Sequence, residues 1–121
     1  MSYVDGFVVP VPEQNLKQYR SIAQKAGKIW KEHGALHYVE AIGDDLDVKF
    51  GLSFNKVIKP KPGETILFSF IVFKSRADRD KVNAKVMSDP RMNKMMENAG
   101  GEMPFDVKRM LYGGFKSLID M

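Results

Sequence analysis

Apolar residues recur at helical spacing in one long stretch of the chain. Between Leu16 and Trp30 they are three and four residues apart, and lysines and glutamines fill the opposite side. Pro12 suits the start of this helix, and Gly34 suits the left-handed residue just past its end. A second helix is predicted from Ser75, whose hydroxyl can cap it together with Asp78. Proline at position 90 breaks or restarts that helix, which then ends at residues 99–101.

Four other stretches are rich in β-branched and aromatic residues and predict strands at 3–9, 35–42, 65–73 and 109–118. We expect Pro10 and Pro12 to end the first strand, because proline cannot donate to a ladder. Residues 43–63 form an insertion with a turn at Gly43, and its 50–58 stretch fits a short strand or a helical turn equally well. The order of elements predicts an α+β, ferredoxin-like βαββαβ fold with an antiparallel sheet and an insertion between strands 2 and 3.

The third strand is apolar on both of its sides. Ile66, Phe68, Phe70 and Val72 alternate with Leu67, Ile71 and Phe73, and only Ser69 interrupts the pattern. A half-exposed strand would alternate apolar and polar residues, so both faces of the sheet are predicted to be buried. Two helices cover one face, and a second copy of the chain is the simplest cover for the other. The alternative is that the 43–63 insertion folds across it.

Short motifs along nearly the whole chain resemble those of one family. They are Tyr3-Val4-Asp5-Gly6-Phe7, Pro10-Val11-Pro12, Gly34-Ala35, Gly43-Asp44-Asp45, Asp89-Pro90-Arg91-Met92, Met103-Pro104-Phe105-Asp106, Lys108-Arg109-Met110 and Tyr112-Gly113-Gly114-Phe115. This chain resembles DUF1428, a family of small bacterial proteins of unknown function in the dimeric α/β-barrel superfamily. The resemblance implies two ferredoxin-like subunits whose sheets pack face to face as a barrel. It supplies no activity: the superfamily includes cofactor-independent monooxygenases, muconolactone-isomerase-like enzymes, haem-degrading enzymes and regulatory ligand-binding domains.

Composition narrows the class of protein. The chain has 121 residues, which fits a single domain over 1–121, and it contains no cysteine, which excludes disulfides and thiolate chemistry. A cytoplasmic location is expected, because no secretory signal or membrane-spanning run is apparent. The net charge is +4, but the lysines are scattered among acids, so we expect no specific nucleic-acid binding and no membrane partner.

Asp5 is the candidate catalytic residue. It shares a strand face with Tyr3 and Phe7, whereas Val4, Gly6 and Val8 form a small apolar face suited to packing against helices. Asp5 is therefore expected to point away from the helices into the space between two sheets. A buried carboxylate is costly unless it is paired or protonated, and such groups are enriched at active sites. The alternative is a structural hydrogen bond or salt bridge.

Four further residues are candidate substrate contacts, namely Tyr38, Glu40, Arg109 and Tyr112. Glu40 and Tyr38 share a strand face, whether inward or outward, and His37 faces the other way. No metal and no cofactor are expected, because cysteine is absent and the two histidines are separated by a helix break. Five methionines precede the last strand, and they either form a deformable pocket wall or fill gaps in the core; they are Met87, Met92, Met95, Met96 and Met103.

Two hypotheses of function from different classes remain. The first is a homodimer that binds or transforms a small molecule, with Asp5 as acid or base, in a cavity either between sheet and helices or at the dimer barrel. The second is a non-enzymatic stress or regulatory module that acts through its basic surface. A closed pocket around Asp5 would favour the first hypothesis, and a filled core with a basic face would favour the second.

Overall fold

The computed structural model describes residues 1–98, 100 and 102–121. Its four strands are β1 (Tyr3–Pro12), β2 (His37–Ile42), β3 (Glu64–Phe73) and β4 (Leu111–Lys116). Its helices are η1 (Glu13–Asn15), α1 (Leu16–His33), α2 (Phe54–Ile58), α3 (Arg76–Met87), α4 (Pro90–Asn98) and η2 (Val107–Arg109). None of the described helices is long and apolar enough to cross a bilayer.

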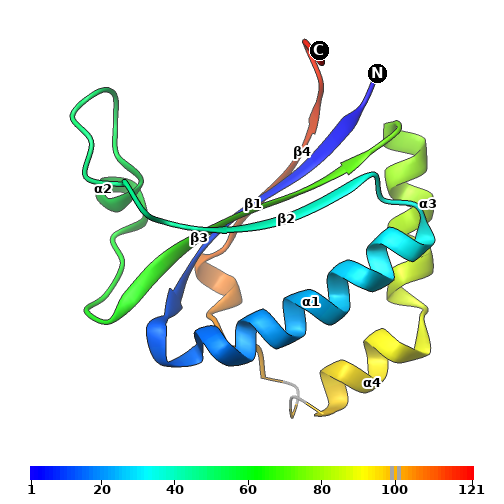
Figure 1. The fold of residues 1–121 in the computed structure, drawn as a ribbon, viewed down its shortest axis with the longest axis horizontal. Helices are drawn as coiled ribbons and strands as arrows, with labels where there is room; N and C mark the ends of the chain where they lie inside the picture. Colours follow the sequence, from blue (N-terminus) through cyan, green and yellow to red (C-terminus); the bar gives the residue numbers. More distant parts are fainter. Residues whose placement is uncertain (99, 101) are drawn as a thin grey trace.

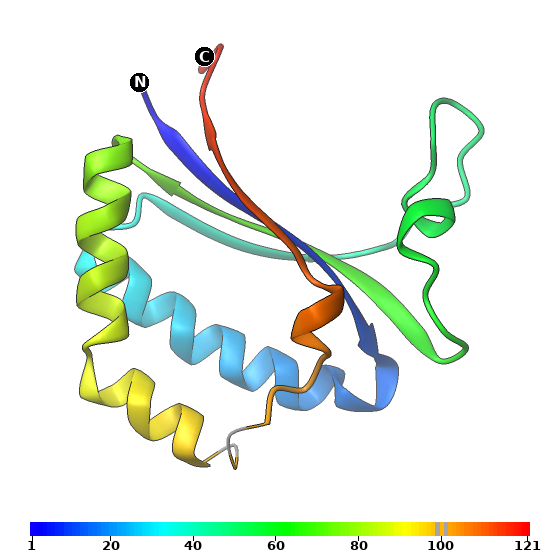
Figure 2. The same ribbon diagram turned by 180° about the vertical axis from the view of Figure 1, so that it is seen from behind.

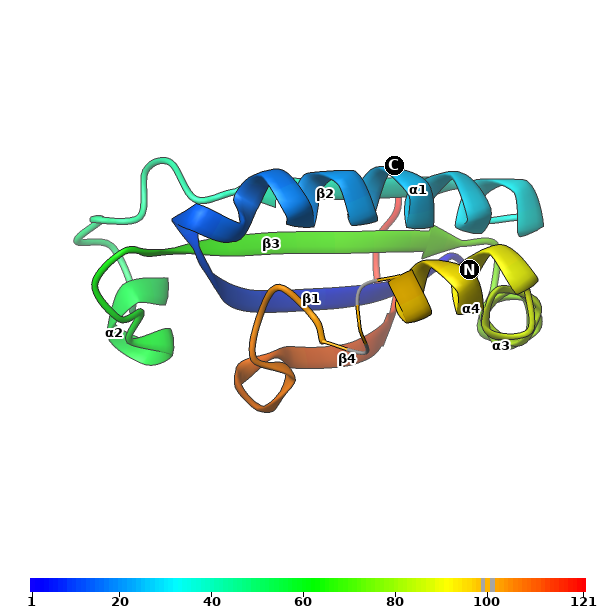
Figure 3. The ribbon, with the colours of Figure 1, turned by 90° about the horizontal axis from the view of Figure 1, so that it is seen from below.

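All strand pairs are antiparallel, and their order is β2-β3-β1-β4. This order confirms the predicted ferredoxin-like fold. Helices α1, α3 and α4 all lie on one side of the sheet and leave the other side bare (Figure 1). Seen from below, α1 runs along the β2 side of the sheet (Figure 3). Residues 102–110, which contain η2, lead to β4 from the helix side of the sheet (Figure 2).

Local signals were accurate for the helices. Gly34 ends α1 with φ 123°, a backbone conformation that favours glycine. The Ser75 hydroxyl accepts from the Asp78 amide at the start of α3, as predicted. Ser53 does the same for Lys56, so the undecided 50–58 stretch contains a short helix. The predicted helix end at 99–101 includes residues outside the described part of the chain.

The prediction that the prolines end the first strand is wrong, because β1 continues to Pro12. Strand β4 pairs with β1 only as far as Val8, whereas β3 pairs with it as far as Pro12. The two prolines therefore lie where one side of β1 has no neighbouring strand that needs their amides.

The bare face of the sheet is apolar. Its residues follow from the strand register and are Val4, Gly6, Val8, Pro10, His37, Val39, Ala41, Ile66, Phe68, Phe70, Val72, Leu111, Gly113 and Phe115. Phe54 of α2 packs edge-on against Phe68, but α2 lies beyond one end of the sheet rather than across it (Figure 1). Phe68 remains 45% exposed and Phe115 63% exposed, whereas Pro10 and Ile66 are buried at the end where the insertion begins, so most of this face is left uncovered.

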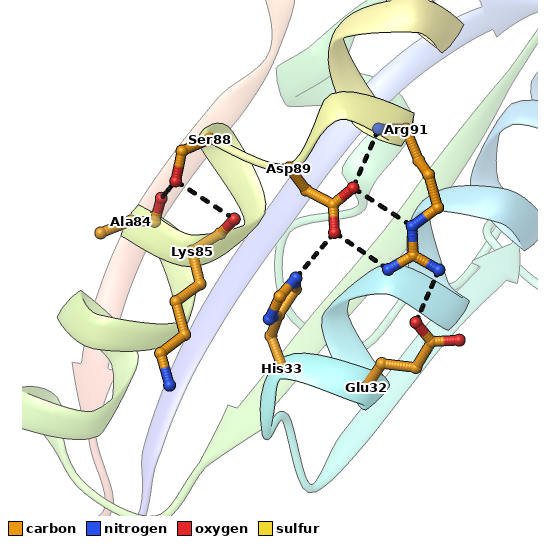
Figure 4. Close-up of polar contacts among 7 residues, drawn as sticks. All are labelled: Glu32, His33, Ala84, Lys85, Ser88, Asp89 and Arg91. Atoms are coloured by element: carbon orange, nitrogen blue, oxygen red, sulfur yellow. Dashed lines mark hydrogen bonds and ion pairs between the residues drawn. The ribbon is translucent and has the colours of Figure 1, made fainter.

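An ion-pair cluster fixes the start of α4 against the end of α1 (Figure 4). The Asp89 carboxylate accepts from His33 Nε2 at 2.8 Å and from Arg91 Nη2 at 2.9 Å. Arg91 also pairs with Glu32 at 2.6 Å, so both acids and the histidine converge on one junction. Hydrogen bonds from Arg91 and His33 hold the pKa of Asp89 far below its ordinary value.

Asp89→Asn is expected to lower the free energy of unfolding at neutral pH and to flatten its dependence on acid. A carboxyl whose pKa is depressed on folding stabilises the fold above its unfolded pKa of about 3.9 and loses that contribution as the pH falls below it. Urea unfolding of the wild type and the variant between neutral pH and pH about 2 measures both effects. Asp80→Asn, at an exposed carboxylate, is the control; equal acid slopes for D89N and the wild type would contradict the prediction.

Candidate functional site

A cavity of about 320 Å³ lies between the helix side of the sheet and the layer formed by α1, α4 and residues 103–110. Its lining is mostly apolar and comprises Phe7, Val9, Tyr19, Ile22, Ala23, Ala26, Trp30, Tyr38, Glu40, Ser69, Ile71, Met87, Met92, Met95, Met96, Met103, Pro104, Phe105 and Met110. This volume is at the lower end of the range for small-molecule sites. The fold thus leaves space for a ligand on the helix side of the sheet.

All five methionines singled out in the sequence line this cavity. Met92 is also buried in the core, 6% exposed, whereas Met87 is 57% exposed and lies at the margin. The structure agrees with both interpretations of the cluster, because all five methionines line the cavity while Met92 and Met95 also pack in the core. A thioether side chain has three rotatable bonds and is polarizable, so such a wall can adapt to the shape of a ligand.

The polar end of the cavity is a carboxylate held by two phenols. Tyr19 Oη donates to Glu40 Oε1 at 2.7 Å, and Tyr38 Oη donates to Glu40 Oε2 at 2.8 Å. Tyr38 and Glu40 are two residues apart on β2 and therefore point to the same face, while Tyr19 reaches them from α1. The inward alternative for Glu40 is the one observed. Ser69 lies opposite Glu40 on β3.

Burial raises the pKa of both tyrosines well above the ordinary value, and the nearby negative charge of Glu40 raises each pKa further. Both phenols therefore stay protonated at neutral pH and serve as hydrogen-bond donors to the carboxylate. A carboxylate facing an apolar space needs such donors, since its burial without them is costly.

The Tyr38 ring is fixed by packing on two sides. It stacks against Trp30 with ring centroids 6.0 Å apart, and it lies over Gly27, where an added Cβ would meet the ring at 2.7 Å. On the other side of these residues, an open groove of about 820 Å³ runs between α1 and β2. The groove and the cavity share Tyr19, Ala23, Tyr38 and Glu40, which therefore form the partition between them.

Asp5 is buried, 1% exposed, but the prediction that it points away from the helices is wrong. It lies on the helix side, where Arg79 Nη1 of α3 donates to Asp5 Oδ1 at 2.8 Å and Asn83 Nδ2 donates to Oδ2 at 3.4 Å. The alternation correctly divides the residues of β1 between two faces, but the predicted assignment of those faces to the helix side and the opposite side is reversed. Asp5 does not line the cavity, although Asn83 links it to Trp30, whose indole N–H donates to Asn83 Oδ1 at 2.9 Å.

Arg109 and Tyr112 also lie outside the cavity lining. Arg109 makes a bidentate pair with Glu64 at 2.8 and 3.0 Å and fixes η2 against the start of β3. Tyr112 stacks on Phe7 at 4.8 Å, and its hydroxyl accepts from Arg79 at 3.4 Å. Among the five candidate site residues, the structure brings only Tyr38 and Glu40 together at the cavity.

Three cavity residues were missed as site candidates in the sequence: Tyr19, Trp30 and Ser69. Tyr19 and Trp30 were assigned to the apolar side of α1, where aromatic residues ordinarily fill the core. Ser69 did carry a signal, because it is the single polar residue in the alternating pattern of β3. A polar residue at an otherwise apolar position indicates a buried polar partner, which here is the Tyr19–Glu40 pair.

Comparisons with known proteins agree with this fold. Residues 2–107 match the family model described as "Protein of unknown function (DUF1428)". The uncharacterized protein YbaA of Escherichia coli K12 is 46% identical over 120 residues, covering 99% of each chain.

Solved structures show the same architecture at low sequence identity. A nipsnap family protein of unknown function from Agrobacterium tumefaciens has a TM-score of 0.58 at 15% identity, covering 96% of this chain and 87% of its own. A variant of SnoaB, a cofactor-independent oxygenase from Streptomyces nogalater, has a TM-score of 0.54 at 9% identity, covering 99% and 94%. These neighbours have the dimeric α/β-barrel fold.

Asp5→Asn is expected to destabilise the protein without preventing occupation of the cavity. The change leaves Arg79 without its buried counter-charge, and a hydrogen bond to a charged group contributes about 1.5–3 kcal/mol. Chemical unfolding measures the loss, with Asp80→Asn as the control at the exposed end of the same arginine. Unchanged stability together with lost ligand binding would instead support the catalytic role predicted from the sequence.

Proposed function

Since the chain belongs to the DUF1428 family of proteins of unknown function, we propose from its own geometry that it binds an apolar small molecule in the cavity beside Glu40. The single observation that carries this proposal is a partly enclosed, methionine-lined space whose only charged lining residue in the described part of the chain is one carboxylate. A few convergent polar groups in an apolar cavity are what ligand sites typically present.

The site also supports chemistry on the bound molecule. Glu40 can accept a proton from a ligand, and a positioned carboxylate is a general base that needs no cofactor. The likeness to a cofactor-independent oxygenase, at 9% identity, shows a shared fold only, so this catalytic step is a proposal from the cavity itself. Asp5 is a less favourable base, because Arg79 and Asn83 already occupy its two oxygens.

The proposal includes a homodimer formed through the bare face of the sheet. Its exposed side chains include three aromatic or large aliphatic residues, namely Phe68, Leu111 and Phe115. Contiguous apolar surface of this kind marks interaction sites, and a second identical sheet provides the matching cover. The cavity lies on the other side of the same sheet, so each subunit would keep its own site.

Filling the cavity is expected to abolish binding while preserving the fold. Ala23→Leu adds apolar volume at a position shared by the cavity and the groove, so no large core rearrangement is required. Butylbenzene is the probe, and Trp30, the only tryptophan, reports occupation through its emission and lines the cavity itself. Ala77→Leu, on the exposed side of α3, is the matched control.

The wild type and A77L should both respond to butylbenzene, with saturation confirmed by calorimetry, and A23L should not respond. A wild type that shows neither a Trp30 response nor a binding heat would rule out the cavity as a ligand site.

Phe68→Glu is expected to convert a dimer into a folded monomer. A charge at this position would be buried and unpaired at a sheet-to-sheet interface, yet Phe68 is 45% exposed in the single subunit, which can therefore tolerate it. Sedimentation velocity at micromolar protein measures the mass. Val107→Glu, which places a charge at another exposed apolar residue on η2, should remain dimeric; a monomeric wild type would refute the dimer.

A further inference from the structure

The cavity has a chemical preference that is set by where its hydrogen-bonding protons already go. Both phenol protons at its polar end are committed to Glu40, one to each carboxylate oxygen. Ser69 lies opposite Glu40 on β3 and brings the one other hydroxyl of the described lining, which can donate or accept. The lone pairs on Glu40 and on the tyrosine oxygens remain free to accept a hydrogen bond from a ligand.

The charge of the lining leads to the same preference. Lys, Arg and His are absent from the described residues that line the cavity, and Glu40 is its one acid. An anionic ligand would have to give up its hydration without a counter-cation and would face a second negative charge at short range in a medium of low dielectric. The cavity therefore disfavours carboxylates, sulfonates and phosphates.

From these two observations we infer that the ligand is a neutral, apolar molecule carrying an O–H or N–H group that donates a hydrogen bond to Glu40. This inference rests on the proposed function and narrows it to a ligand class, such as a phenol, an enol or an alcohol on an aromatic or aliphatic body. The same hydrogen bond would point the donor's proton at the Glu40 carboxylate, which is the group best positioned to remove it.

Three probes with one common body test the ligand class: 4-butylphenol, 4-butylanisole and 4-butylbenzoate. They offer a donor, an acceptor without a donor, and an anion, respectively. Binding is measured on the intact protein at neutral pH by Trp30 emission, excited where the probes do not absorb, and by calorimetry. The phenol should bind about tenfold or more tightly than the anisole, the scale of one hydrogen bond to a charged group, and the benzoate should not bind.

Glu40→Gln provides the test of cause. Its amide carries donors and no charge, so the advantage of the phenol should shrink and the benzoate should become measurable. Glu13→Gln, at an exposed residue of η1, should keep the wild-type order. Unfolding curves for both variants verify that the comparison is made between folded proteins.

The outcomes separate the two proposals. Equal binding of all three probes, or tighter binding of the benzoate, would overturn the ligand class and leave the cavity as a binding site. An order that is unchanged in E40Q would also overturn it, because the discrimination would then not come from the carboxylate. No Trp30 response to any probe would overturn the proposed function itself.

Discussion

A carboxylate that faces an apolar space must be hydrogen-bonded, and the way this chain bonds Glu40 determines much of its architecture. One donor comes from β2 itself and fixes the carboxylate, and the other comes from α1, so the Tyr19–Glu40 bond ties the longest helix to an edge strand. A helix held only by apolar contacts could slide along the sheet, whereas this directional bond restrains its position and rotation. The cavity lies directly inside this connection.

Two other polar clusters hold the remaining helices around the same space. Arg79 and Asn83 attach α3 to Asp5 on β1, and Asn83 continues the chain of hydrogen bonds to Trp30. Asp89 and Arg91 attach the start of α4 to the end of α1. The Asp5 and Asp89 clusters therefore hold the helices of the layer through contacts outside the cavity lining. The apolar side chains that line the cavity do not have to fill it for these helices to stay in place.

The sequence was sufficient for the fold because its signals are local. Periodicity over Leu16–His33, the cap at Ser75 and the order of the strands identify a ferredoxin-like chain before any contact is known. The sequence did not predict correctly on which side of the sheet the Asp5 side chain lies. Alternation in β1 shows which residues lie together but not which set meets the helices, and the decisive partner, Arg79, lies 74 residues away on a helix that reads as mostly polar. The small residues Val4 and Gly6 suggested helix packing, but they lie on the bare face.

In the candidate site, too, contacts within one strand could be predicted from the sequence, whereas contacts between elements could not. Tyr38 and Glu40 could be placed together because they are neighbours on one strand face. Tyr19 could not be joined to them, because the rotation of a helix against a sheet depends on packing that no pattern within the helix specifies. A void is even less accessible to sequence reasoning, since it is a property of how side chains fail to fill space.

That failure to fill space is itself informative. Core substitutions that open cavities cost stability in proportion to the volume left, on the order of several kcal/mol for voids of a few hundred cubic ångströms. Larger residues at Ala23 and Ala26, which line the 320 Å³ cavity, would fill part of it, yet both positions carry alanine. The wall opposite is made of methionines, the aliphatic residues best able to change shape around a guest. An adaptable, mostly apolar space with one hydrogen-bonded carboxylate at its end is poorly explained as packing alone, and it fits the ligand site that we propose.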